Sequence, residues 1–180
     1  MQGGTASCSD KRLVAGQEES VIAQENETIL HAAPPKVWTA LTRFENYERW
    51  SPFVRIAGPL ELGALVQYSF RTKTNNPRFF TVDARITSLE RQKRVTFRLG
   101  LRGLISIEES YSLAPVPVGS QLVHSFRCTG LLPMLKPNRT RHNLNEILEA
   151  TDRGFRRHLS QARPPSPAKK RVRKGSRAND

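Results

Sequence analysis

Apolar and polar side chains alternate along most of the chain from residue 65 to residue 129, which is the pattern of half-buried β-strands. Turn residues divide this region, and each remaining run predicts one strand: 65–73, 79–90, 95–99, 105–113 and 122–129. Strands at this short and regular spacing favour a continuous antiparallel meander over β-α-β units.

The pattern before this region is mixed. A looser alternation in residues 20–32 predicts a first strand at a sheet edge, carrying Val21, Ala23, Thr28, Leu30 and Ala32. Helical spacing begins after Pro34-Pro35, a pair that suits the first turn of a helix. It continues in the aromatic-rich run 44–50, which Ser51-Pro52 ends, because a residue before proline avoids the α region. Two short helices joined at an angle are therefore expected.

A third helical pattern lies near the C-terminus and is longer than the other two. Residues 138–161 keep a period of 3.6 through an apolar stripe of Leu144, Ile147, Leu148, Thr151, Phe155 and Leu159. On the wetter side we expect two ion pairs at i,i+4 spacing, Glu149 with Arg153 and Asp152 with Arg156. The whole pattern predicts an α+β fold in which a curved antiparallel sheet of about six or seven strands wraps around this helix.

This architecture predicts an internal cavity. One curved sheet and one helix across its concave face cannot bring every facing side chain into contact. Any open space should be lined by apolar groups, because an unpaired buried polar group costs about 1–3 kcal/mol. The expected ligand-binding residues are Trp50, Tyr68, Phe70, Phe80, Val82, Phe97, Ile107, Glu109, Tyr111, Leu122, His124, Phe126, Ile147, Thr151 and Phe155. The alternative, that these side chains form a solid core, remains open.

Three polar residues carry the candidate chemistry. His124 and Glu109 fall on the inner faces of neighbouring strands, and Tyr111 lies two residues after Glu109. An imidazole beside a carboxylate can transfer a proton, although a buried histidine held by structural hydrogen bonds is the more common case. No nucleophile elbow, phosphate loop, HExxH or CxxC motif occurs in the sequence, and the four histidines are scattered. We therefore expect neither a metal nor a cofactor.

Composition and charge set the boundaries of the domain. The 180 residues carry a formal charge of +13, but residues 163–180 alone hold seven Lys or Arg and one Asp. We expect one domain in residues 20–161, with disordered flanks at 1–19 and 162–180. The two cysteines lack the spacing of a disulfide framework, which predicts a reduced protein. We find no apolar run long enough for a signal peptide or a membrane span, so we expect a cytoplasmic protein.

Two groups of residues carry a resemblance to a known family. The first is Ala33-Pro34-Pro35, Val37-Trp38, Leu41, Phe44-Glu45-Asn46-Tyr47, Trp50-Ser51-Pro52-Phe53 and Gly58-Pro59-Leu60, and the second is Gly119 to Ser125 with Gly130-Leu131-Leu132. Over residues 20–161 the chain resembles the polyketide cyclase/dehydrase and lipid-transport family of the START-like (SRPBCC) superfamily. The resemblance implies the helix-grip fold of the major birch-pollen allergen and an apolar internal ligand. Related members often carry an acidic residue two positions after the histidine, where this chain has Phe126.

These observations lead to one expected function and two alternatives. We expect a carrier or sensor that binds a small lipid-like or polyketide-like molecule without transforming it. The first alternative is a cyclase/dehydrase-type enzyme that uses His124 with Glu109 and Tyr111. The second assigns the function to the basic tail, as a nuclear-import signal in a eukaryote or as a weak contact with nucleic acid or anionic lipid. The tail residues concerned are Lys169, Lys170, Arg171, Arg173 and Lys174.

Overall fold

The computed structural model describes residues 21–73, 77–101 and 104–161. The predictions of disorder in residues 1–19 and 162–180, and those made for the tail contacts, lie outside the described residues. Along the chain the elements are β1 (Ile22–Leu30), α1 (Pro34–Thr42), η1 (Phe44–Asn46), α2 (Tyr47–Trp50), β2 (Val54–Ala57), β3 (Leu65–Phe70), β4 (Phe80–Glu90), β5 (Arg94–Leu101), β6 (Ile105–Val116), β7 (Gly119–Thr129), α3 (Leu131–Leu135) and α4 (Pro137–Gln161).

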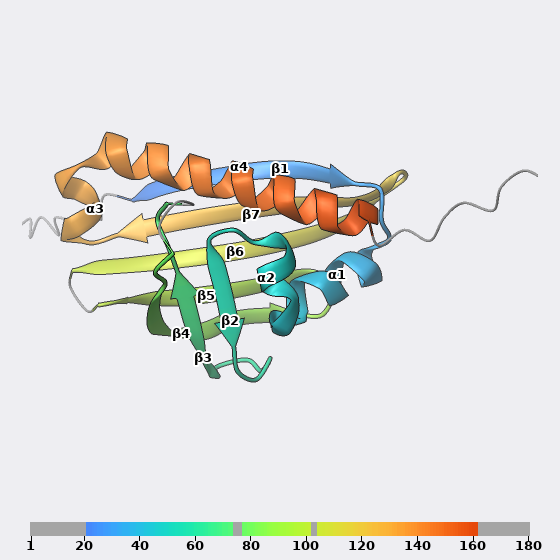
Figure 1. Cartoon of the computed structure of the whole chain (residues 1–180), viewed down its shortest axis with the longest axis horizontal. Coiled ribbons are helices and arrows are strands. Elements are labelled where there is room, and N and C mark those ends of the chain that lie inside the picture. Colours follow the sequence, from blue (N-terminus) through green and yellow to red (C-terminus); the bar gives the residue numbers. More distant parts are fainter. Residues whose placement is uncertain (1–20, 74–76, 102–103, 162–180) are drawn as a thin grey trace, which may run out of the picture.

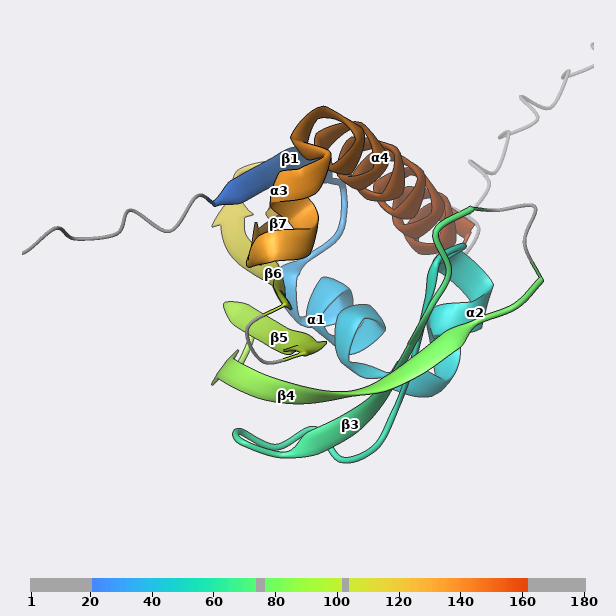
Figure 2. The ribbon, with the colours of Figure 1, turned by 90° about the vertical axis from the view of Figure 1, so that its left-hand side faces the viewer.

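The seven strands form one antiparallel sheet in the order β1-β7-β6-β5-β4-β3-β2. Except for β1, which pairs with β7, each strand follows its neighbour in the sequence, so the predicted meander is confirmed. The sheet curls, and α4 closes its open side between β1 and α2 (Figures 1 and 2). The two short helices expected after the first strand are α1 and the η1–α2 segment. The predicted helix-grip fold is therefore confirmed.

The inner face of the sheet follows the predicted alternation in its central strands. The cross-strand pair of Tyr111 and His124 shows how the register brings the buried side chains of β6 and β7 onto one face. A bulge between Ile86 and Ser88 changes the phase of β4, so that Leu89 packs against the core after it. In β1 the predicted phase is wrong at the start: Ile22 is buried and Val21 is exposed. The regular pairing of β1 with β7 sets this phase.

Helix α4 corrects one prediction and confirms another. Glu149 and Arg153 form the expected exposed pair, with Oε2 and Nη1 3.2 Å apart. Asp152, predicted to pair with Arg156 on the wetter face, is instead 4% exposed and points into the molecule. Its carboxylate contacts Asn26 on β1 and His124 on β7, and these contacts stabilise it in the interior. Among the described residues, no helix has the length and apolar character needed to cross a bilayer.

Helix α4 crosses the end of α2 at a glycine. A Cβ atom built on Gly154 would lie 2.1 Å from the backbone oxygen of Trp50, far inside van der Waals contact. The ring of Trp50 packs against Phe155, with ring centroids 4.7 Å apart. A side chain at position 154 would therefore push apart the two helices that close this end of the domain.

This contact generates the first prediction. An alanine normally stabilises a helix by about 1 kcal/mol relative to glycine. We expect Gly154→Ala to do the opposite and to lower the free energy of unfolding by about 1–3 kcal/mol, because backbone atoms must move. Urea denaturation measures the change, with Asn145→Ala on the exposed face of α4 as the control. An unchanged or raised stability of Gly154→Ala would contradict the close approach.

Candidate functional site

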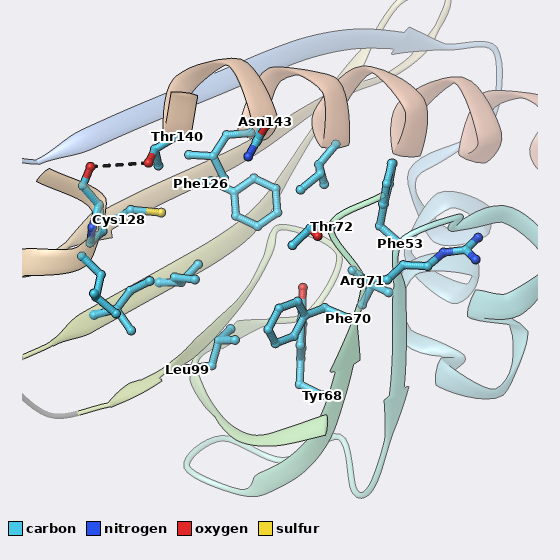
Figure 3. Close-up of a pocket in the computed structure, with 17 residues that line it drawn as sticks. Phe53, Tyr68, Phe70, Arg71, Thr72, Leu99, Phe126, Cys128, Thr140 and Asn143 are labelled. Carbon is cyan, nitrogen blue, oxygen red and sulfur yellow. Dashed lines mark hydrogen bonds between the residues drawn. The ribbon is translucent and has the colours of Figure 1, made fainter. Parts of the chain in front are cut away.

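A cavity of about 340 Å³ lies at the α3 end of the domain, between the start of α4 and the concave face of the sheet (Figure 3). Most of its wall is apolar, and the rings of Tyr68, Phe70 and Phe126 form its middle. The apolar lining consists of Phe53, Val54, Phe70, Leu99, Ile105, Ile107, Phe126, Leu132, Pro133, Leu144 and Ile147. This volume and composition are typical of small-molecule sites.

The cavity reaches the surface between the end of β3 and α3. Thr72 and Leu132 both line it and are both exposed, Leu132 to 48%. Thr140 and Asn143 on the first turns of α4 are half-buried and add neutral polar groups. An apolar interior with a few polar groups near its opening suits an amphiphilic molecule whose polar end faces outward.

Arg71 also lines the cavity, but its guanidinium is directed away from the centre (Figure 3). Its Nε donates a hydrogen bond to the backbone oxygen of Pro52 at 2.6 Å, and its Cζ lies 5.1 Å from the centroid of the Phe79 ring. These contacts fix the side chain in the wall. The charge of Arg71 therefore contributes to the rim of the site more than to its interior.

A second feature, a chain of hydrogen bonds, lies deeper in the domain than the cavity lining. Asp152 on α4 accepts a hydrogen bond from Nδ2 of Asn26 at 2.5 Å and contacts Nδ1 of His124 at 3.0 Å. On the other side of the imidazole, Nε2 of His124 lies 3.0 Å from Oε1 of Glu109. This chain joins the helix to three strands, β1, β7 and β6.

Two tyrosines complete the surroundings of Glu109. The hydroxyl of Tyr111 donates to Oε1 at 2.8 Å, and the hydroxyl of Tyr68 donates to Oε2. The ring of Tyr111 also stacks on the imidazole of His124, with centroids 4.2 Å apart and planes at 16°. Burial and the nearby Glu109 charge raise the pKa values of both tyrosines well above 10, so both remain donors.

His124 carries a proton at neutral pH. Its burial opposes the charged form, but the hydrogen bonds and charges of Asp152 and Glu109 outweigh this effect and raise its pKa from 6.5 to about 9. The imidazolium thus lies between two carboxylates, and both of its nitrogens are bonded. Buried charges arranged in this way stabilise one another, whereas removing one partner leaves an uncompensated charge.

The cavity and the hydrogen-bonded chain adjoin each other at Tyr68. Its ring lines the cavity while its hydroxyl bonds to Glu109. His124 and Glu109 are 0% and 1% exposed and lie outside the cavity lining. Within the described part of the chain, Tyr68 is therefore the group shared by both, and the ring of Phe126, another lining residue, lies 5.3 Å from the imidazole between ring centroids.

The structure divides the predicted site residues into four groups. Tyr68, Phe70, Ile107, Phe126 and Ile147 line the cavity. Glu109, Tyr111 and His124 belong to the hydrogen-bonded chain. Trp50, Phe97, Leu122, Thr151 and Phe155 are buried outside the cavity lining. Phe80 and Val82 are 56% and 37% exposed, because the first half of β4 pairs with β3 alone.

Sequence reasoning missed Asp152 and the residues of α3. Asp152 lies four residues after Leu148, which is a position on the buried stripe, so helical spacing alone placed it inward. Leu132 and Pro133 line the mouth of the cavity but belong to a five-residue helix. A helix of that length leaves no periodic signal in a sequence.

The comparisons with known proteins agree with this geometry. The sequence model of the family described as polyketide cyclase/dehydrase and lipid transport matches residues 23–160. No curated protein sequence matches the chain significantly.

Solved structures share the fold at low sequence identity. A protein of unknown function, SA2116 from Staphylococcus aureus, superposes with a TM-score of 0.64 at 14% identity, covering 80% of this chain and 96% of that one. MLL2253 from Mesorhizobium loti superposes with a TM-score of 0.63 at 16% sequence identity, covering 79% of this chain and 100% of that one. The di-domain ARO/CYC StfQ from the steffimycin biosynthetic pathway superposes with a TM-score of 0.59 at 17% sequence identity, covering 78% of this chain and 50% of that one. These likenesses establish the fold.

The charged state of His124 generates the second prediction. Because its folded pKa is above its unfolded value, the stabilisation is complete below about pH 6.5 and is lost as the pH rises toward 9. We expect the free energy of unfolding to fall by roughly 1–3 kcal/mol across this window. Chemical denaturation at a series of pH values measures it.

His124→Gln is the control, since it removes the titrating group. Cys128, whose pKa burial raises from 9.0 to about 11, lowers the stability of both proteins in the same way above about pH 9. The difference between the two proteins therefore isolates His124. An equal pH dependence in both would contradict the charged imidazole.

Proposed function

Because the chain belongs to the polyketide cyclase/dehydrase and lipid transport family, we propose that it binds one small hydrophobic molecule in its cavity and does not transform it. The observation that carries this proposal is the separation of the two features described above. The apolar cavity reaches the surface, whereas His124 and Glu109 are buried and lie outside its lining. A carrier or a sensor needs the first feature alone.

The size of the cavity limits the class of ligand. A cavity of about 150 Å³ accommodates one benzene ring. On that scale, about 340 Å³ corresponds to two or three fused rings, or to a single chain of roughly ten to fourteen carbons. Neutral polar groups on Thr72, Thr140 and Asn143 match a hydroxyl or carbonyl group at one end. A planar phenolic polyketide or a single-chain lipid fits this description, and a two-chain phospholipid does not.

The geometry favours binding over cyclisation. A general acid or base must come within about 2.6–3.2 Å of the atom whose proton it transfers. His124 uses both nitrogens for Asp152 and Glu109, and Oε2 of Glu109 accepts from the hydroxyl of Tyr68, a lining residue. Tyr68 itself is a weak acid, because burial and Glu109 raise its pKa well above 10. These contacts support a structural role for the chain of hydrogen bonds.

The third prediction tests ligand binding. Titration with a fluorescent fatty acid and with a fluorescent planar phenol should show one saturable site for at least one of the two probes. Ile147→Trp fills the cavity from α4, and we expect it to weaken that binding about tenfold or more. Glu149→Trp, on the exposed face of the same helix, is the matched control and should bind as the wild type does.

The variant His124→Gln separates the carrier from the enzyme. If the imidazole only supports the wall, this variant keeps the affinity of the wild type for the probe, after correction for any loss of stability. The proposal would be contradicted if none of the probes showed saturable binding. It would also be contradicted if Ile147→Trp bound the probe as tightly as the wild type does.

A further inference from the structure

Five exposed leucines lie on α3 and beside the adjoining ends of β5 and β6. Helix α3 is at the end of the domain that faces the viewer in Figure 2. Leu131, Leu132 and Leu135 belong to α3 and are 66%, 48% and 74% exposed, while Leu101 and Leu104 are 63% and 45% exposed. The two segments are joined, because the backbone N–H of Leu132 donates to the oxygen of Leu104 at 3.0 Å. We call these five residues the leucine patch.

The patch is unusual because its members come from two segments whose backbones are joined by a hydrogen bond. Single exposed apolar side chains are ordinary on protein surfaces, whereas a contiguous group of large ones marks an interaction site. Helix α3 turns Pro133 inward, where it lines the cavity, and presents Leu131 and Leu135 outward. The short helix therefore has one face in the wall of the cavity and one face on the surface.

Basic side chains border the leucine patch on its α3 side, whereas the exposed Asp83 lies in the same surface groove as Leu101. The sequence contains no Asp or Glu in residues 91–107 or 110–145. Lys136, Arg139 and Arg141 follow α3 directly and are exposed. Glu108, the acidic residue closest in sequence to Leu104, is paired with Arg98 at 2.8 Å. Apolar side chains bordered by cations complement a surface that has negative charge above hydrocarbon.

We propose that the leucine patch, with Lys136, Arg139 and Arg141, docks this protein onto a bilayer containing anionic phospholipids. The leucines enter the acyl region and the basic side chains contact the headgroups. A second copy of the chain also offers leucines, but it would bring two positively charged borders together, so the charge favours the membrane.

Docking in this orientation has a consequence for the cavity. Leu132 belongs to the patch and to the cavity lining, so the mouth would face the acyl region. A single-chain or planar hydrophobic molecule then passes between membrane and cavity without crossing water. This consequence rests on the proposed carrier function, whereas the docking itself does not.

The fourth prediction tests docking by sedimentation of the full chain with vesicles of phosphatidylcholine, with or without phosphatidylserine. We expect binding that depends on phosphatidylserine and falls roughly tenfold or more in the double variant Leu131→Ser/Leu135→Ser. The double variant Leu62→Ser/Val118→Ser removes exposed apolar side chains from other turns and should bind as the wild type does. All three proteins keep the basic tail, so its contribution is equal in each.

Two further measurements separate the possible outcomes. The fluorescent probe, titrated without vesicles, should bind the Leu131→Ser/Leu135→Ser variant with unchanged affinity, which distinguishes a failure of docking from a failure of the carrier function. Circular dichroism checks that the variant folds. Equal vesicle binding by this variant and the wild type overturns the proposal, and so does the absence of vesicle binding by the wild type. A wild-type dimer that this variant dissociates assigns the patch to a second copy and also overturns it.

Discussion

The contact between Asp152 and His124 is the interaction on which the arrangement of the interior depends. It joins α4 to β7, the neighbour of the edge strand β1, through a buried ion pair with 3.0 Å between the two atoms. Burying these charges costs free energy. The hydrogen bonds of Glu109 with His124, Tyr68 and Tyr111 offset this cost. These directional contacts therefore fix the position of α4 along the sheet. Apolar contacts alone would fix that position less strictly.

This constraint divides the interior into two parts. Around Trp50, Phe97 and Phe155, aromatic rings pack closely and leave little space between α4 and the sheet. Toward α3 the helix packs on β1 and β7, where Leu144 meets Ile22 and Cys128. The cavity lies between this part of the helix and the strands β3, β5 and β6. Tyr68 forms the boundary, with its hydroxyl in the polar chain and its ring in the cavity wall. The protein thus has a rigid polar centre beside an open apolar site.

Much of the fold could be predicted from the sequence because the central strands obey a simple period. Alternation placed Glu109, Tyr111 and His124 on one face, and antiparallel pairing brought them together. The position of the cavity could not be predicted, because curvature decides where a sheet and a helix separate. Asp152 was assigned to solvent from its charge, although its spacing placed it inward. Phe80 satisfied the alternation but is exposed, because its strand lacks a neighbour on one side.

The central claim is that the cavity and the buried ionic chain have different roles, one in binding and one in support. A crystal structure of the protein with a bound planar phenol or single-chain lipid tests it most directly. We expect electron density for the molecule between Phe126, Tyr68 and Ile147, with the contacts of His124 to Asp152 and Glu109 still present. A molecule that displaces either carboxylate and bonds to the imidazole would contradict it.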